Sequence, residues 1–207
     1  TLLGSRGCPI FCPYCPYASA QGAKWRFRQP HDVVDEMKEV YSDYGIRCAQ
    51  FRDAIFTYNK GWAEEICELI INEGLAGKMS WICETAVRYL DPGLLKLMKQ
   101  AGCRHVGIGV ETADEELQRK YARNKIISNE HAAEVFRTCR SIGLSTCAFF
   151  MLGFPEETAQ TIRKTIALAK KLDSDEIQFT IVTGYPGTVM NEMFGSGRRG
   201  LPLEKLE

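Results

Sequence analysis

Apolar and polar positions repeat with two different periods along this chain, and the alternation predicts a regular series of strands and helices. Short, almost continuously apolar runs are typical of strands whose two faces are both covered. Between these runs, apolar residues recur at helical spacing. The predicted strands are residues 1–6, 46–56, 79–83, 105–110, 144–152 and 176–182; the predicted helices are residues 31–44, 62–72, 115–122, 129–142 and 158–172, with a short last one from Val189.

Helix boundaries are marked by capping residues and glycines. A further helix is predicted to begin at Asp91-Pro92, with Asp91 as its N-cap, and to end at Gly102. Strands that alternate with helices predict a parallel sheet with right-handed crossovers. The chain holds about six such βα units, fewer than an eight-unit barrel of about 250 residues contains. The predicted fold class is therefore α/β, with a parallel sheet forming a partial (β/α)6 barrel.

Composition places the chain among ordinary globular domains. It has 207 residues, of which 45% are hydrophobic and 25% charged, with a formal net charge of +0. This balance gives no broad basic surface, so nucleic acid is not an expected partner. No apolar run approaches the roughly 18 residues of a membrane span. Nine cysteines, most of them scattered along apolar segments, do not resemble a disulfide scaffold and predict a reducing, cytoplasmic location.

Three of the cysteines gather near the start of the chain, and they carry the strongest chemical signal. Cys8, Cys12 and Cys15 have the spacing Cys-x-x-x-Cys-x-x-Cys. A cubane iron–sulfur cluster has four irons, so three thiolates leave one iron open to a substrate or cofactor. Pro9 and Pro13 stiffen the loop and disfavour a helix.

Two other kinds of site fit three nearby cysteines. They could be half of a structural zinc site, but such sites usually repeat a Cys-x-x-Cys pair or end in histidines. An electron-transfer ferredoxin would need a fourth cysteine in a fitting place. Neither a second pair nor suitably spaced histidines occur here.

The loop resembles the cluster loop of the radical S-adenosylmethionine (SAM) superfamily, including the aromatic residue before the third cysteine, here Tyr14. The resemblance implies a partial six-unit barrel and a 4Fe-4S cluster whose open iron is chelated by the SAM methionine group. It also implies reductive cleavage of SAM to a 5′-deoxyadenosyl radical that takes hydrogen from a substrate. The backbone of Tyr14 would contact the adenine.

Further candidates follow the predicted strands, whose carboxyl ends carry function in a parallel barrel. By resemblance, Asp53 binds the SAM ammonium; the alternative is a structural hydrogen bond. Glu111 ends a glycine-spaced strand and by resemblance binds the SAM ribose, while Arg123, or else Lys125, binds the SAM carboxylate. Glu84 and Arg88 are weaker pocket candidates that a structural ion pair explains equally well.

Two later turns also resemble the family: residues 152–158, with Glu156 in place of a glycine, and residues 183–188. The first is expected to shape the adenine pocket through its backbone. The segment around Asp53 resembles members that also bind cobalamin, so methyl transfer with cobalamin held by a domain absent from this chain is one expectation. Residues 1–207 are expected to be one core domain cut from a longer protein. Its partners would be a small-molecule or peptide substrate and an electron donor such as flavodoxin or ferredoxin.

Overall fold

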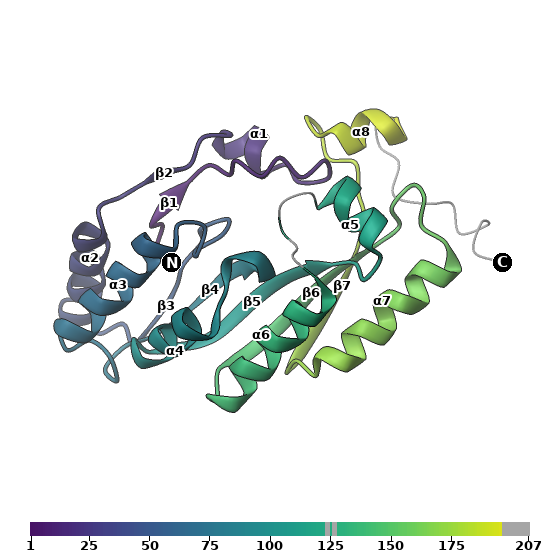
Figure 1. Ribbon diagram of the computed structural model, residues 1–207. Helices are drawn as coiled ribbons and strands as arrows, with labels where there is room; N and C mark the ends of the chain where they lie inside the picture. The colour runs from purple at the N-terminus through teal and green to yellow at the C-terminus, as the bar shows by residue number, and fades with distance from the viewer. Residues whose placement is uncertain (123–124, 126–127, 196–207) are drawn as a thin grey trace.

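The computed structural model describes residues 1–122, 125 and 128–195, and its centre is a five-stranded parallel sheet in the order β3-β4-β5-β6-β7. The sheet is curved into a half-barrel with helices along its outer side (Figure 1). The fold class predicted from the alternating pattern is therefore confirmed. The strands are β3 (Cys48–Gln50), β4 (Ser80–Ala86), β5 (Cys103–Glu111), β6 (Ser145–Leu152) and β7 (Glu176–Ile181).

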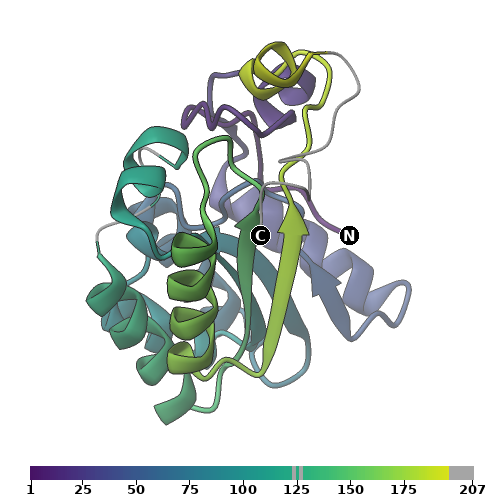
Figure 2. The same ribbon diagram turned by 90° about the vertical axis from the view of Figure 1, so that its right-hand side faces the viewer.

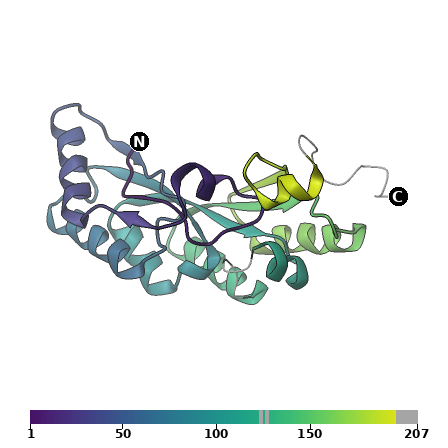
Figure 3. The same cartoon turned by 90° about the horizontal axis from the view of Figure 1, so that it is seen from above.

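The outer helices pack against one another in the order in which they follow the strands. Their apolar faces and the outer face of the sheet enclose the main core, which includes the fully buried Trp81, Phe51 and Phe56. Figure 3, viewed from above, shows these helices following the curve of the sheet. They are α2 (Pro30–Ser42), α3 (Lys60–Asn72), α4 (Pro92–Gln100), α6 (Asn129–Ser141) and α7 (Ala159–Leu172).

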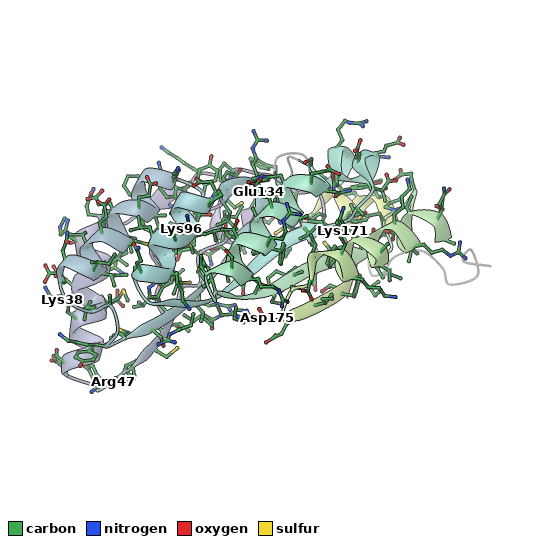
Figure 4. All side chains as sticks on the ribbon, turned by 60° about the horizontal axis from the view of Figure 1, so that its bottom comes forward. Lys38, Arg47, Lys96, Glu134, Lys171 and Asp175 are labelled. Atoms are coloured by element: carbon green, nitrogen blue, oxygen red, sulfur yellow. The ribbon has the colours of Figure 1, made fainter. Side chains whose placement is uncertain are left out.

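Asp91 caps α4 as the sequence predicts, and Thr158 caps α7. The Asp91 carboxylate accepts hydrogen bonds from the backbone N–H groups of Gly93 and Leu94, at 2.9 and 3.1 Å. Thr158 caps α7 by accepting one from the N–H of Thr161 at 3.2 Å. The exposed sides of these helices are polar, as Lys96 on α4, Glu134 on α6 and Lys171 on α7 show in Figure 4.

The start of the chain differs from the single strand predicted for residues 1–6. Leu2 forms a parallel bridge with Phe51 beside β3, and β1 (Ser5–Arg6) then pairs antiparallel with β2 (Arg26–Phe27). The predicted strand 46–56 is correspondingly short, because the chain leaves the sheet after Phe51. Neither β2 nor the short helix α1 (Tyr17–Gln21) is predicted, since both are short and lie in a segment without a clear period.

Three short elements stand at the carboxyl ends of the strands. α1, α5 (Glu115–Tyr121) and α8 (Val189–Phe194) lie at this end, together with the cysteine loop, as Figure 2 shows from the side. A 3-10 turn, η1 (Val87–Tyr89), follows β4. Two contacts attach the segment after β7 to the start of the chain: the N–H of Met190 donates to the carbonyl of Pro13 at 2.9 Å, and the Ser19 hydroxyl donates to the carbonyl of Gly187 at 2.8 Å.

Candidate functional site

The cysteine loop lies between β1 and α1, across the carboxyl end of the sheet (Figure 1). It turns at Gly7, which has a φ of +84°. An added Cβ would lie 2.1 Å from the Lys24 carbonyl oxygen, so this position requires glycine. The N–H of Cys8 donates to the Gly22 carbonyl and that of Cys15 to the Cys12 carbonyl, both at 3.0 Å. These bonds fix the loop with all three thiols partly exposed.

The three thiols open into one cavity of about 270 Å³. Its wall also includes Asp53, from the segment after β3, and Lys125, from the segment after α5. The cavity thus collects cysteines and charged groups at the carboxyl ends of the strands, where parallel barrels place their chemistry.

Three cysteine thiols on one cavity suit a cubane cluster, which takes each cysteine on a different iron. Among the residues that the structure describes, no group of three histidine, cysteine, aspartate or glutamate side chains is arranged to hold a single ion. The three thiols are also free and accessible from the cavity, as ligands of a cluster need to be.

Lys125 places a positive charge near the cysteines. Burial raises the pKa of the Cys8 and Cys12 thiols, and the ammonium group of Lys125 opposes this increase. A cation beside the loop stabilises the thiolate form, the form that binds iron.

Glu111 and Lys125 form a buried ion pair beside the loop. Nζ of Lys125 lies 2.7 Å from Oε1 of Glu111, and their side chains are only 17% and 6% exposed. Glu111 has a φ of 71° and follows a register shift between β5 and β6, which together set the direction of its side chain. An added Cβ on Gly109 would lie 2.9 Å from this carboxylate oxygen, so glycine makes room for the pair.

Tyr14 completes this group. Its hydroxyl lies 3.5 Å from Nζ of Lys125, and the same ammonium lies 5.7 Å from the centre of its ring. Burial alone lowers the pKa of Lys125, but the Glu111 carboxylate raises it well above its usual value. Burial and the same carboxylate raise the pKa of Tyr14. Lys125 is therefore a fixed cation at the edge of the cavity.

Of the two basic candidates for the SAM carboxylate, the structure describes Lys125; Arg123 lies outside the described residues. Backbone hydrogen bonds hold Lys125 in place, because its N–H donates to the Ala122 carbonyl at 2.8 Å and its carbonyl accepts from Arg88 at 3.2 Å.

Asp53 makes structural hydrogen bonds, the role that the sequence offered as an alternative to binding SAM. Its carboxylate accepts from the Ser5 hydroxyl at 2.5 Å and from the Gly4 N–H at 3.1 Å, which ties the start of the chain to the end of β3. Burial raises its pKa, and these hydrogen bonds oppose the increase. Asp53 also lines the cavity, and an ionised carboxylate can accept further hydrogen bonds beyond these two.

Glu84 forms an ion pair with Arg52 and not with Arg88, the partner that the sequence suggested. Glu84 lines the cysteine cavity, and its carboxylate lies 3.7 Å from the guanidinium of Arg52. Arg88 is exposed and lines a different hollow with Pro9 and Ile10, behind the cysteine loop. Arg52, which the sequence reasoning did not select, thus belongs to the cavity.

An apolar wall supports the loop on the side of β6. The ring of Phe154 packs edge-on against Tyr14 at a centroid distance of 6.0 Å and stacks on Tyr121 at 4.8 Å. Phe154 belongs to the turn after β6 that was expected to shape the adenine pocket through its backbone. Its buried side chain adds a packing role that the turn pattern did not reveal.

A family model and several known proteins match this chain. A model of the radical SAM superfamily matches residues 2–169. An uncharacterized methyltransferase of Pyrococcus horikoshii is 35% identical over 187 residues, which cover 90% of this chain and 40% of that protein. The anaerobic magnesium-protoporphyrin IX monomethyl ester cyclase of Cereibacter sphaeroides is 28% identical over 192 residues, covering 89% of this chain and 30% of the cyclase.

Among solved structures, the radical SAM methyltransferase TsrM from Kitasatospora setae, with cobalamin and a 4Fe-4S cluster bound, superposes with a TM-score of 0.87. The identity is 23%, over 93% of this chain and 36% of TsrM, so this likeness concerns the fold. The chain spans 40% or less of the length of these proteins. Within the described ranges, no helix has both the length and the apolar character needed to cross a membrane.

Proposed function

This chain belongs to the radical SAM superfamily, and we propose that Cys8, Cys12 and Cys15 hold its 4Fe-4S cluster with one iron open to SAM. The cofactors of this superfamily are the cluster and SAM. The observation that carries the proposal is the single cavity that joins the three thiols to Asp53 and Lys125. When bound, the cluster supplies the electron that cleaves SAM to methionine and a 5′-deoxyadenosyl radical.

The residues around the cavity would bind and orient SAM at its charged and polar groups. A lysine ammonium has three N–H donors, and among the described residues Glu111 and Tyr14 face two of them; the third would bind the SAM carboxylate. Glu111 keeps acceptor capacity for the ribose hydroxyls, as a carboxylate at a strand end does in dinucleotide sites.

The remaining SAM contacts fall to Asp53 and Tyr14. The Asp53 carboxylate would accept hydrogen bonds from the SAM amino group, and the backbone at Tyr14 would contact the adenine. Arg123 stays a predicted second ligand of the SAM carboxylate.

For the whole protein, we propose cobalamin-dependent methyl transfer. Residues 1–207 would be its radical-generating core domain, and the cobalamin would bind in a separate domain. The relative named as a methyltransferase and the cobalamin-containing TsrM support this choice. We further propose a small-molecule or peptide substrate, flavodoxin or ferredoxin as the electron donor, and a cytoplasmic location, which the nine free cysteines favour.

The experiment that tests this function is SAM cleavage by the anaerobically reconstituted protein. With a chemical reductant, we expect methionine and 5′-deoxyadenosine to form in equal amounts, measured by chromatography, and neither to form without iron. The full-length protein should cleave SAM faster than residues 1–207 alone. A fully loaded cluster that yields no 5′-deoxyadenosine would contradict the proposal and favour the alternative of an iron–sulfur electron-transfer or cluster-carrying module without SAM chemistry.

A further inference from the structure

A second hollow, of about 570 Å³, lies beside the cysteine cavity and is strongly basic. It is formed by the start of the chain, the β1–β2 ribbon and α2. Four arginines line it, against the single carboxylate of Glu36: Arg6, Arg26, Arg28 and Arg52. The whole chain has 26 basic and 26 acidic residues, so this hollow concentrates positive charge locally. Such a concentration favours an anionic ligand.

The ribbon brings two of these charges face to face. In the antiparallel register of β1 and β2, Arg6 stands directly opposite Arg26. Like charges in this position destabilise a pair of strands. An anion bound between them would turn this repulsion into two attractions.

Two of the four arginines are fixed by the surrounding backbone. Arg26 donates to the carbonyls of Gln21 and Lys24, at 2.8 and 3.1 Å. Arg28 donates to the carboxylate of Glu36 and, at 3.0 Å, to the carbonyl of Asp32. The carbonyl contacts orient both guanidinium groups and leave the charge of Arg26 unpaired among the described residues, whereas Arg28 is paired with Glu36.

The other two arginines keep donors available. Within the ranges that the structure describes, Arg6 makes no side-chain hydrogen bond or ion pair, and Arg52 has only the 3.7 Å contact with Glu84. A guanidinium fork matches phosphate and carboxylate oxygens in a bidentate manner. Phe27, half-exposed and stacked on Trp25 at 4.7 Å, adds a flat apolar surface to the same hollow.

Arg52 lines both hollows and so connects them. A molecule with its anionic group among the arginines would extend past Arg52 toward Cys8 and Lys125. We propose that the arginine hollow binds phosphate or carboxylate groups of the substrate and thereby directs the rest of that molecule into the cysteine cavity. The role as a substrate subsite rests on the proposed function; the anion binding itself does not.

The test is calorimetric titration of the full-length, cluster-loaded protein with inorganic pyrophosphate and, separately, with citrate. We expect a Kd below about 1 mM for at least one of them. Arg6→Gln and Arg52→Gln should each weaken that binding roughly tenfold, because each removes a charge-assisted hydrogen bond. The control is Arg47→Gln: Arg47 is an exposed arginine near the other end of β3, labelled in Figure 4, and the change should leave the affinity within about twofold.

Tighter binding of pyrophosphate would support a phosphate-bearing substrate, and tighter binding of citrate a carboxylate-bearing one. Unchanged affinity in the Arg6→Gln/Arg52→Gln double variant, or an equal loss in Arg47→Gln, would overturn the anion site. The anion site would also be overturned if neither anion bound at a concentration ten times the expected Kd of about 1 mM. SAM cleavage by the same wild-type sample separates the two proposals. If only the anion site is wrong, the protein still cleaves SAM. If only the SAM site is wrong, the protein still binds the anion.

Discussion

Replacing Cys8, Cys12 and Cys15 together by alanine is expected to reduce bound iron from about four atoms per chain to background. The three thiols line one cavity and, in our proposal, supply every protein ligand of the cluster. SAM cleavage should fall to the level of the iron-free protein, since no other group in the site supplies the electron. Iron and sulfide assays after anaerobic reconstitution measure the first effect, and 5′-deoxyadenosine formation measures the second.

The matched control for this loss is Cys48→Ala. Cys48 is an exposed free cysteine on β3, outside the cavity, and its removal should leave iron, sulfide and SAM cleavage unchanged. The assignment is wrong if the triple variant, folded by circular dichroism, still takes up about four irons. It is equally wrong if Cys48→Ala loses as much iron as the triple variant does.

Breaking the Glu111–Lys125 pair is expected to have the second largest effect. Glu111→Leu leaves the ammonium of Lys125 buried without its partner, and removing one member of a buried ion pair typically costs about 3–5 kcal/mol of stability. The same change removes the carboxylate proposed to bind the SAM ribose, so SAM affinity should fall at least about tenfold. Chemical denaturation and equilibrium binding of SAM measure the two losses separately.

The double variant Glu111→Leu/Lys125→Leu separates packing from binding. Apolar residues of similar volume often replace a buried ion pair at little cost, so most of the lost stability should return. SAM affinity should stay low, because both polar contacts are gone. Restored affinity in the double variant would mean that the pair only supports the loop and does not contact SAM.

The pH dependence of stability follows from the direction of the Lys125 shift. Its pKa is higher in the folded protein than in the unfolded chain, where lysine titrates near about 10.4. The stability that the Glu111–Lys125 pair contributes is therefore fully present below the unfolded-state pKa, and it is lost as the pH rises through the folded-state pKa. We expect the stability difference between wild type and the double variant to be constant from pH 6 to 9 and to change only in strongly alkaline solution.

The repeating strand and helix pattern was sufficient to predict the half-barrel, because most of the long elements bury a continuous apolar run or stripe; β7, whose residues are all exposed, is the exception. The β1–β2 ribbon and α1 were missed because they bury no such run. Ser5–Arg6 and Arg26–Phe27 are two residues each, and the segment between them, rich in cysteine, proline and glycine, has no strand or helix period. Their positions depend on tertiary contacts, such as the bond from Ser5 to Asp53, that no local period reveals.

The candidate site was predictable where chemistry requires a fixed spacing and unpredictable where it depends on folding. Cysteine spacing identified the loop, and the glycine-spaced end of β5 identified Glu111. The sequence did not decide between Arg123 and Lys125, since both lie in one short segment. It gave no sign that Arg52 connects two hollows, because its position follows from where the chain leaves β3.

The most direct test of the central assignment is magnetic resonance of the reduced cluster in the presence of SAM. SAM would be isotopically labelled at the amino nitrogen and carboxylate oxygens of its methionine group. We predict that these labelled nuclei couple magnetically to the cluster in the wild-type protein, because the open iron binds both groups. A reduced cluster at full occupancy, with SAM bound but no coupling to the labelled nuclei, would contradict the assignment of an open iron to this three-cysteine site.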